Sequence, residues 1–171
     1  YDIRSLLNEY TLYIIPCANP DGVEIVLSND VPESNVRVSK LSEYKANKNG
    51  VDLNRNFPLA WEHIDNGVTS PADYYFKGYK SASEKETKVL MGLCLENDFS
   101  FMISVHIKGN CIFWGDTYKT NNNALYKAFA KDICDASGLL MTEPTKKAKN
   151  YGGGFENWFR HTFERPGVCI E

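Results

Sequence analysis

The sequence has few histidines, no large excess of positive or negative charge, and no long apolar run. Its 171 residues include 3 histidines, and 19 lysines and arginines against 22 aspartates and glutamates give a formal net charge of −3. Because the two signs are interspersed, the chain has no basic stripe of the kind that binds nucleic acid. No apolar run approaches the ~20 residues that cross a bilayer as a helix. We therefore expect neither a nucleic-acid partner nor a membrane span.

Cysteine is scarce as well, and it is scattered. The 5 cysteines form no Cys-x-x-Cys pair, and their odd number argues against a disulfide scaffold. Each lies in an apolar neighbourhood, where a thiol behaves as a small hydrophobic group. We expect buried thiols at Cys17, Cys94, Cys111, Cys134 and Cys169.

What remains is ordinary globular composition, 43% hydrophobic and 24% charged, enough for one domain with a sizeable core. Short apolar runs predict strands at residues 12–16, 99–105, 111–114 and 168–171. The run at 99–105 is nearly continuous and predicts a central strand. Helices are predicted at residues 81–96, 123–137 and 155–163. Alternating strands and helices are typical of an α/β layered fold.

Local signals predict where the first helix begins. Ser81 with Glu84, and Ser83 with Glu86, form two overlapping capping boxes. The apolar face of this helix is predicted to contain Val89, Leu90 and Leu93.

Two other segments carry clear signals. Leu125, Phe129 and Ile133 repeat every four residues and predict the buried face of the second helix, which Gly138 ends. Residues 19–22, Asn-Pro-Asp-Gly, predict a turn directly after the first strand. The polar segments 29–49 and 54–61 are predicted loops.

Asn54 and Arg55 lie in the segment Gly-Val-Asp-Leu-Asn-Arg-Asn-Phe at residues 50–57. A guanidinium fork beside an amide can hold a carboxylate in one orientation. For an isolated Asn-Arg pair, the alternative is a solvated arginine on a surface loop.

This pair is accompanied by polar residues at strand ends. His106 ends the run at 99–105, and Glu171 ends the run at 168–171. Strand ends in α/β sheets open into the crevice where ligands bind. The alternatives are a packed histidine and a terminal glutamate without a role.

The order of these motifs resembles the zinc carboxypeptidase family. Asn-Pro-Asp-Gly is followed by Gly-Val-Asp-Leu-Asn-Arg-Asn-Phe, Ser-x-His, Tyr-Gly-Gly-Gly with a later Trp, and a strand that ends in Glu. The segments 44–50 and 106–114 are most similar to bacterial γ-D-glutamyl-L-diamino acid endopeptidases, which cut murein peptides between γ-D-glutamate and diaminopimelate. The resemblance implies a three-layer α/β/α fold around a mixed, mostly parallel sheet.

The resemblance also implies roles for single residues. His106 matches the third zinc ligand, and a neutral imidazole suits that position. Glu171 matches the carboxylate that takes a proton from water and passes it to the leaving amine. Asn54 and Arg55 match the pair that grips the terminal carboxylate of the substrate.

Three further matches are looser. Tyr151 matches the mobile tyrosine that covers bound substrate, with Lys149 as the alternative when the position is counted back from the later tryptophan. Lys48 falls near an arginine that polarises the scissile carbonyl, and a solvated lysine is the equal alternative. Glu156 falls near the position that sets side-chain preference, where an acidic group would suit a substrate with a free amine such as diaminopimelate.

The first two zinc ligands of the family come from a His-x-x-Glu segment before Asn-Pro-Asp-Gly, and no histidine precedes Asn19 here. We therefore expect residues 1–171 to be one partial catalytic domain, truncated at its N-terminus, that binds zinc weakly or not at all alone. A literal His-x-x-Glu at His161–Glu164 follows His106 in the chain, so it predicts a polar helix face. His63 is expected at the surface.

The sequence thus predicts a zinc-dependent peptidase acting beside a carboxylate-terminated residue, with the γ-D-glutamyl–diaminopimelate bond of murein peptides as the favoured target. One alternative is a peptide-binding module without catalysis, and another is a carboxypeptidase that acts on ordinary protein C-termini. The compartment stays open between bacterial cytoplasm and cell wall.

Overall fold

The computed structural model describes residues 3–30, 35–107, 109–115, 122–142 and 152–171 of the chain. A sheet of four strands runs through its centre, in the order β1-β4-β2-β3. β1 pairs with β4 in parallel, β2 pairs with β3 in parallel, and β2 runs antiparallel to β4. The strands are β1 (Met102–Val105), β2 (Cys111–Phe113), β3 (Leu140–Met141) and β4 (Gly167–Ile170). The predicted mixed, mostly parallel sheet is confirmed.

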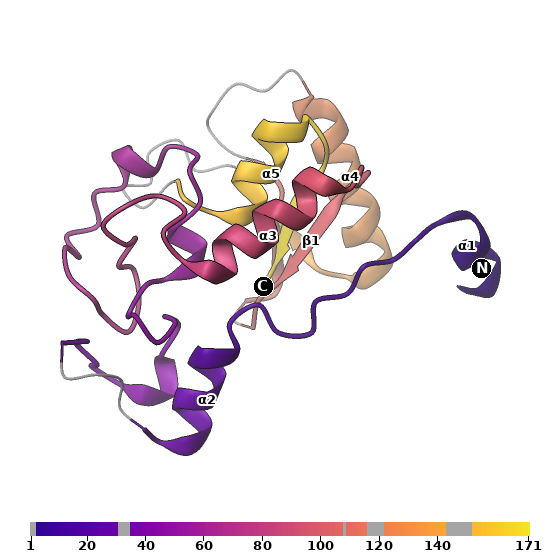
Figure 1. Ribbon diagram of the computed structural model, residues 1–171. Coiled ribbons are helices and arrows are strands. Elements are labelled where there is room, and N and C mark those ends of the chain that lie inside the picture. Colours follow the sequence, from indigo (N-terminus) through magenta and orange to yellow (C-terminus); the bar gives the residue numbers. More distant parts are fainter. Residues whose placement is uncertain (1–2, 31–34, 108, 116–121, 143–151) are drawn as a thin grey trace.

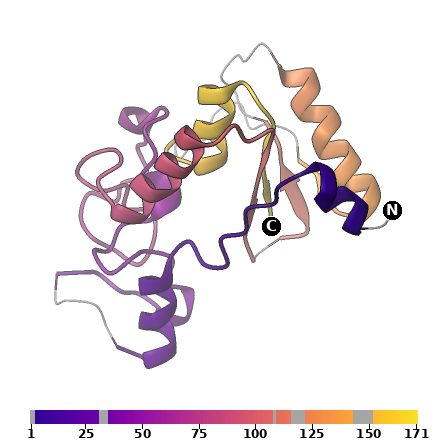
Figure 2. The ribbon, with the colours of Figure 1, turned by 45° about the vertical axis from the view of Figure 1, so that its right-hand side comes forward.

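Helices cover both faces of this sheet. α4 (Asn123–Ser137) lies on one face, and α3 (Lys85–Glu96) and α5 (Phe155–Phe163) lie on the other (Figure 2). On the α4 side, the buried cluster is formed by Ile112, Trp114, Tyr126, Ala130 and Val168. On the α3 and α5 side, it is formed by Phe57, Leu90, Cys94, Trp158 and Phe159. The three-layer α/β/α fold is therefore confirmed.

α4 has the predicted bounds, and Phe129 and Ile133 pack against the buried cluster as predicted, whereas Leu125 does not. Gly138 ends it in the left-handed conformation, at φ 77°, and its N–H donates to Cys134 at 2.8 Å. The buried residues are Tyr126 and Ala130, whereas Leu125 is 51% exposed. The prediction that placed Leu125 in the core was wrong, because the helix is rotated so that its small Ala130 faces the sheet.

β1 is an edge strand rather than the predicted central one. Ile103 and Val105 on β1, and Phe101 just before it, are 43%, 76% and 45% exposed. α4 covers β2 and β4 but leaves much of this part of β1 uncovered, and within the described ranges no strand pairs with its outer edge. The apolar run at residues 99–105 therefore did not mean that both faces of the strand are buried.

The N-terminal segment departs most from expectation. α1 (Ile3–Glu9), which was not predicted, has no buried residue and stands away from the rest of the chain (Figure 1). Residues 12–16 were predicted as a buried strand, yet Leu12 and Ile14 are 64% and 72% exposed. The segment is extended, and the Tyr13 hydroxyl donates to Asn97 at 3.1 Å. No described strand pairs with this segment.

Asn-Pro-Asp-Gly begins a helix rather than forming an isolated turn. α2 (Pro20–Ser28) has proline at its first position, and the Asn19 side chain caps it by accepting from Gly22 N–H at 3.0 Å. Asparagine and proline favour both turns and helix starts, so the sequence signal was ambiguous. Within their described residues, the predicted loops further on contain the short 3-10 turns η1 (Leu41–Glu43), η2 (Leu53–Arg55) and η3 (Trp61–His63). They also contain one half of an isolated β-bridge, between Arg37 and Ala72.

α3 begins later than predicted, after Glu84, and neither capping box forms. The Asn56 side chain, distant in sequence, accepts from Glu84 N–H at 3.2 Å and donates to the Ser83 hydroxyl at 3.1 Å. This tertiary contact replaces the local caps. Val89 is exposed rather than packed with Leu90.

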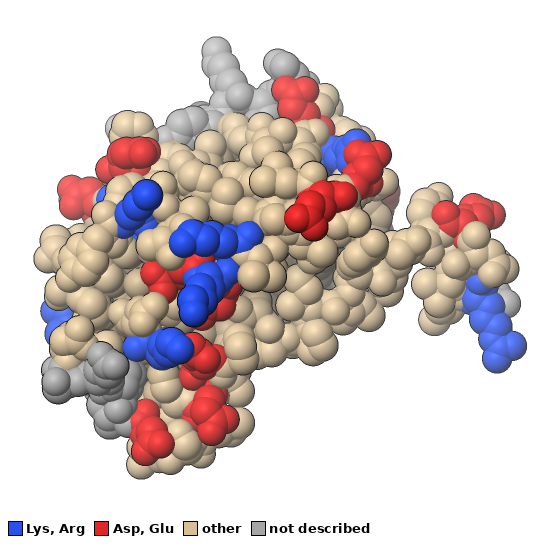
Figure 3. Space-filling view, viewed as in Figure 1, with Lys and Arg blue, Asp and Glu red and all other residues tan. Residues whose placement is uncertain are grey.

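The cysteines are free thiols, as predicted, but not all are buried. Cys94 and Cys169 are buried, Cys111 and Cys134 are half-buried, and Cys17 is exposed. Burial raises the pKa of Cys94 to about 11. Across the described ranges, no helix is long and apolar enough to traverse a bilayer. Figure 3 shows acidic and basic side chains interspersed on one face of the molecule.

Candidate active site

His106 and Glu171 lie side by side just beyond the ends of two neighbouring strands. β1 and β4 are parallel, with Val105 opposite Ile170, so the next residue of each chain segment emerges at the same edge of the sheet. His106 Nδ1 is 3.8 Å from Glu171 Oε1, and both side chains are partly exposed. Their adjacency follows directly from parallel pairing.

Ser104 holds the imidazole of His106 from the other side. The two residues are two positions apart, so they share one face of the sheet. Ser104 Oγ is 3.2 Å from His106 Nε2. A hydrogen bond to one ring nitrogen fixes the ring so that the other nitrogen faces its ligand. Here the nitrogen left for a ligand is Nδ1, the one nearest Glu171.

Cys169 completes a compact group with these two residues. One ligand atom each from His106, Cys169 and Glu171 lies within 4.8 Å of the others. Cys169 is only 4% exposed. Burial raises its thiol pKa far above the ordinary range, and the carboxylates of Glu156 and Glu171 raise it further. We had not predicted a role for Cys169, although its position two residues before Glu171 places both on one face of β4.

The donor atoms of this group suit a zinc ion. Two nitrogen or oxygen ligands, each about 2.1 Å from a tetrahedral zinc ion, lie about 3.4 Å apart. The observed 3.8 Å between His106 Nδ1 and Glu171 Oε1 is close to that separation. Imidazole, thiolate and carboxylate are all ligands that zinc accepts.

Asn54 and Arg55 lie in the η2 turn, where each has a structural contact. The Asn54 side-chain oxygen accepts from Phe155 N–H at 2.9 Å, at the start of α5. Arg55 Nη1 donates to the Asn54 carbonyl at 2.6 Å, and its Cζ is 5.7 Å from the Tyr75 ring centroid. Arg55 Nε is buried without a hydrogen-bond partner among the described residues. Arg55 therefore has a buried donor that an anion could satisfy.

A close backbone contact attaches the η2 turn to the start of α5. Phe57 N–H donates to the Gly153 carbonyl at 2.9 Å. Gly153 has φ +67°, and a Cβ there would lie 2.8 Å from Arg55 Cα and nearer still to the Arg55 carbonyl oxygen. Only glycine fits this approach.

Glu156 brings a buried carboxylate to the same face of the sheet. It lies in the first turn of α5 and is 8% exposed. Its Oε2 has no hydrogen-bond partner within the described part of the chain. Because its charge raises the pKa of Cys169, it lies near the group of His106, Cys169 and Glu171. A buried carboxylate oxygen without a partner is costly, so it indicates a place for a cation or a donor.

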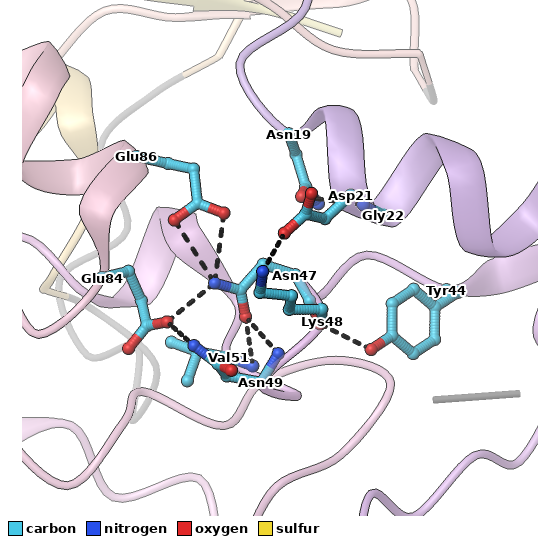
Figure 4. Close-up of polar contacts among 10 residues, drawn as sticks. All are labelled: Asn19, Asp21, Gly22, Tyr44, Asn47, Lys48, Asn49, Val51, Glu84 and Glu86. Carbon is cyan, nitrogen blue, oxygen red and sulfur yellow. Dashed lines mark hydrogen bonds and ion pairs between the residues drawn. The ribbon is translucent and has the colours of Figure 1, made fainter. Parts of the chain in front are cut away.

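The other predicted site residues lie elsewhere or outside the described residues. Lys48 is exposed, and its ammonium is 3.7 Å from Asp21 Oδ2 (Figure 4). Tyr151 and Lys149 lie outside the described ranges. His161 is half-buried and Glu164 is exposed at the end of α5, and neither joins the described group of metal-capable side chains. His63 is exposed, as predicted.

A buried amide network supports the loop that leads to η2 (Figure 4). Asn47 is 1% exposed, and its Nδ2 donates to Glu84 Oε2 at 2.7 Å. Its Oδ1 accepts from the backbone N–H groups of Asn49 and Val51 at 3.1 and 3.2 Å. This network was not predicted, and it fixes the loop before Asn54 and Arg55.

Replacing Glu84 with Gln should reduce the loss of unfolding free energy that accompanies a fall in pH below about 4.5. Burial alone would raise the Glu84 pKa, but hydrogen bonds from Ser83, Asn47 and Asn49 outweigh it and lower the pKa from about 4.5. The charged carboxylate therefore adds stability above pH ~4.5 that is lost as pH falls through the lower folded-state pKa. We expect a loss of about 2 kcal/mol at pH 7 and a smaller further loss on acidification.

Urea unfolding at pH 7 and at pH 4 measures both effects. Glu62→Gln, at an exposed acidic residue, is the matched control and should follow the unmodified chain at both pH values. If Glu84→Gln lost as much unfolding free energy between pH 7 and pH 4 as the unmodified chain, the hydrogen bonds of Glu84 would not contribute to the pH dependence of stability.

A family profile and a curated relative both connect this chain with zinc peptidases. The family profile described as zinc carboxypeptidase matches residues 1–164. The chain is 31% identical to gamma-D-glutamyl-L-diamino acid endopeptidase 1 of Lysinibacillus sphaericus, over 97% of this chain and 43% of that protein. It therefore spans less than half the length of that relative.

Two solved structures share the fold. Carboxypeptidase A of Helicoverpa armigera superposes with a TM-score of 0.67 at 20% identity, over 92% of this chain and 41% of that chain. The murein-tripeptide amidase MpaA of Escherichia coli O157 superposes with a TM-score of 0.54 at 21% identity, over 91% of this chain and 56% of that chain.

Proposed function

Because this chain belongs to the zinc carboxypeptidase family, we propose that it forms part of a zinc-dependent peptidase that cuts murein peptides between γ-D-glutamate and diaminopimelate. The observation that carries the proposal is the pairing of His106 with Glu171 across 3.8 Å at the ends of parallel strands. The relative from Lysinibacillus sphaericus, whose name specifies a γ-D-glutamyl-diamino acid bond, supports the substrate class.

His106 would hold the metal, and Glu171 would move the proton. Zinc, when bound, supplies a Lewis acid that activates water and polarises a carbonyl. The Glu171 carboxylate takes the proton from the attacking water and then gives it to the leaving amine. Ser104 keeps the His106 ring oriented by its contact at Nε2.

Arg55 and Asn54 would hold the terminal carboxylate of the substrate. The buried, unpartnered Nε of Arg55 supports this assignment, since a carboxylate would satisfy it. Asn54 uses its side-chain oxygen to cap α5, so its amide nitrogen is the end that can donate to the substrate. Binding of the terminal carboxylate by Arg55 and Asn54 would determine which peptide bond lies beside Glu171.

Glu156 would bind the free amine of diaminopimelate. Its buried carboxylate has an oxygen without a hydrogen-bond partner among the described residues, and a substrate ammonium would neutralise it. Lys48 would add positive charge near the scissile carbonyl, and Tyr151 would cover the bound substrate. Asp21, 3.7 Å from the Lys48 ammonium, reduces the charge that Lys48 can offer.

Digestion of two peptides tests the proposal. The protein that carries this chain is incubated with zinc and with either L-alanyl-γ-D-glutamyl-diaminopimelate or a protein-type peptide, and the products are identified by mass spectrometry. The proposed function requires release of diaminopimelate. Release only from the protein-type peptide would favour an ordinary carboxypeptidase, and binding of peptide without cleavage would favour a binding module.

Replacing Glu156 with Gln should selectively impair the substrate with the free amine. Loss of one buried charge pair costs about 2 kcal/mol or more, so we expect kcat/KM for the diaminopimelate peptide to fall at least about 30-fold. For the same peptide with alanine in place of diaminopimelate, kcat/KM should change little. Equal losses on both peptides would contradict a role in amine recognition.

A further inference from the structure

Tyr75 has an unusual backbone conformation for a bulky residue. Its φ is +66°, in the left-handed region, which residues with a Cβ adopt only at a cost. Two hydrogen bonds hold it there: the Tyr75 N–H donates to Asp52 Oδ2 at 3.1 Å, and the Asn66 side chain donates to the Tyr75 carbonyl at 2.7 Å. Because strained backbone of this kind concentrates at functional sites, the position of the Tyr75 side chain calls for a functional explanation.

The half-buried Tyr75 ring lies against the Arg55 guanidinium. Arg55 Cζ is 5.7 Å from the ring centroid, within the ~6 Å at which a cation is attracted to the face of an aromatic ring. Tyr74 packs edge-on against the same ring, with the two centroids 4.8 Å apart. On another side, Arg55 Nη1 donates to the Asn54 carbonyl at 2.6 Å. The ring and this carbonyl together restrict the orientation of the guanidinium.

Asp52 connects Tyr75 to the turn that contains Arg55. The Asp52 side chain is buried, and its two oxygens accept from different segments: Oδ1 from Asn54 N–H at 3.2 Å, and Oδ2 from Tyr75 N–H at 3.1 Å. The Asp52 N–H also donates to the Phe76 carbonyl at 2.8 Å. One residue thus fixes the η2 turn relative to Tyr75, although Asp52 and Tyr75 are 23 residues apart in the chain.

We propose that Tyr75 is a positioning residue for substrate binding, whose ring supports the Arg55 guanidinium in the orientation that binds the terminal carboxylate of the peptide. The inference rests on the proposed function for the role of Arg55. All N–H groups of a guanidinium lie in its plane, so a ring on its face leaves its donors available. A guanidinium that is already oriented also loses less freedom when the carboxylate binds.

Binding of two peptides to the protein that carries this chain tests the proposal without any cleavage. Isothermal titration calorimetry in the presence of a zinc chelator compares the murein tripeptide with the same peptide in which the carboxylate next to the scissile bond is a carboxamide. Tyr75→Leu should weaken binding of the carboxylate peptide about tenfold, and that of the carboxamide peptide less than about twofold, because only the first needs an oriented Arg55. Tyr75→Phe keeps the ring and should bind both peptides as the unmodified protein does.

Tyr79→Leu is the matched control, because Tyr79 is an exposed tyrosine whose ring packs against Phe76, with centroids 5.0 Å apart. Its binding of both peptides should be unchanged. Tyr75→Gly provides a second variant should Tyr75→Leu fail to fold, since glycine adopts a φ of +66° without strain. It also lacks the ring, so it should show the same selective loss of affinity for the carboxylate peptide.

Three results would overturn the proposal. Folded Tyr75→Leu could bind the carboxylate peptide as tightly as the unmodified protein does, or it could lose equal affinity for both peptides, which is the mark of a purely structural role. The unmodified protein could also bind both peptides equally, so that Arg55 does not recognise the carboxylate. If the zinc-loaded protein leaves the tripeptide uncut while Tyr75→Leu still shows the selective loss, the positioning role stands and the proposed function fails.

Discussion

Replacing Glu171 with Gln in the protein that carries this chain should lower kcat for the murein tripeptide by about 10³-fold, the typical contribution of one positioned acid–base group. Gln keeps the size of the side chain and its place beside His106, 3.8 Å away. It cannot accept a proton from water. KM should change little, because the proposed contacts to the terminal carboxylate come from Arg55 and Asn54 and not from Glu171.

Steady-state kinetics at saturating zinc measures this effect, since saturation removes any difference in metal affinity. Glu164→Gln is the matched control, because Glu164 belongs to the other His-x-x-Glu segment and lies outside the group at His106. Its kcat should equal that of the unmodified protein. Full activity in Glu171→Gln would refute the role of Glu171, and loss of activity in Glu164→Gln would move the metal site to α5.

The sequence predicted those parts of the structure that depend on local pattern. The bounds of α4 and α5, and the strands that lead to His106 and Glu171, follow from periodicity and from glycine and proline signals. The adjacency of these two residues then follows from parallel pairing of β1 and β4. The pairing itself could not be read from local pattern, since β2 and β3 lie between β1 and β4 in the chain; the family resemblance implied it.

Contacts between distant segments could not be predicted in the same way. Asn47 and Glu84 are 37 residues apart and meet in a buried hydrogen bond, but each alone resembles a polar loop residue. Cys169 lies in an apolar run, where a thiol ordinarily indicates core packing. Its thiol is affected by the charge of Glu156, which α5 brings from outside the strand. Segment 12–16 is apolar enough for a strand, but a strand also needs a second strand to pair with, and no described strand pairs with this segment.

Replacing Gly153 with Ala should lower the free energy of unfolding by about 3 kcal/mol. The largest displacement should be at Asn54 and Arg55, the pair proposed to bind the substrate carboxylate. The left-handed φ of +67° is costly for alanine, and its Cβ would lie 2.8 Å from Arg55 Cα. The η2 turn must therefore move away from α5. This would break the bond from Phe57 N–H to Gly153 and displace Arg55, so KM should rise as stability falls.

Gly67→Ala separates the two causes. Gly67 has φ +76°, and a Cβ there meets nothing within 4 Å, so alanine encounters the backbone strain without the steric clash. Its free energy of unfolding should fall by only about 1 kcal/mol, with KM unchanged. Urea unfolding and steady-state kinetics on both variants make the comparison. Equal losses at the two glycines would mean that η2 and α5 are not held in the close contact on which the orientation of Arg55 depends.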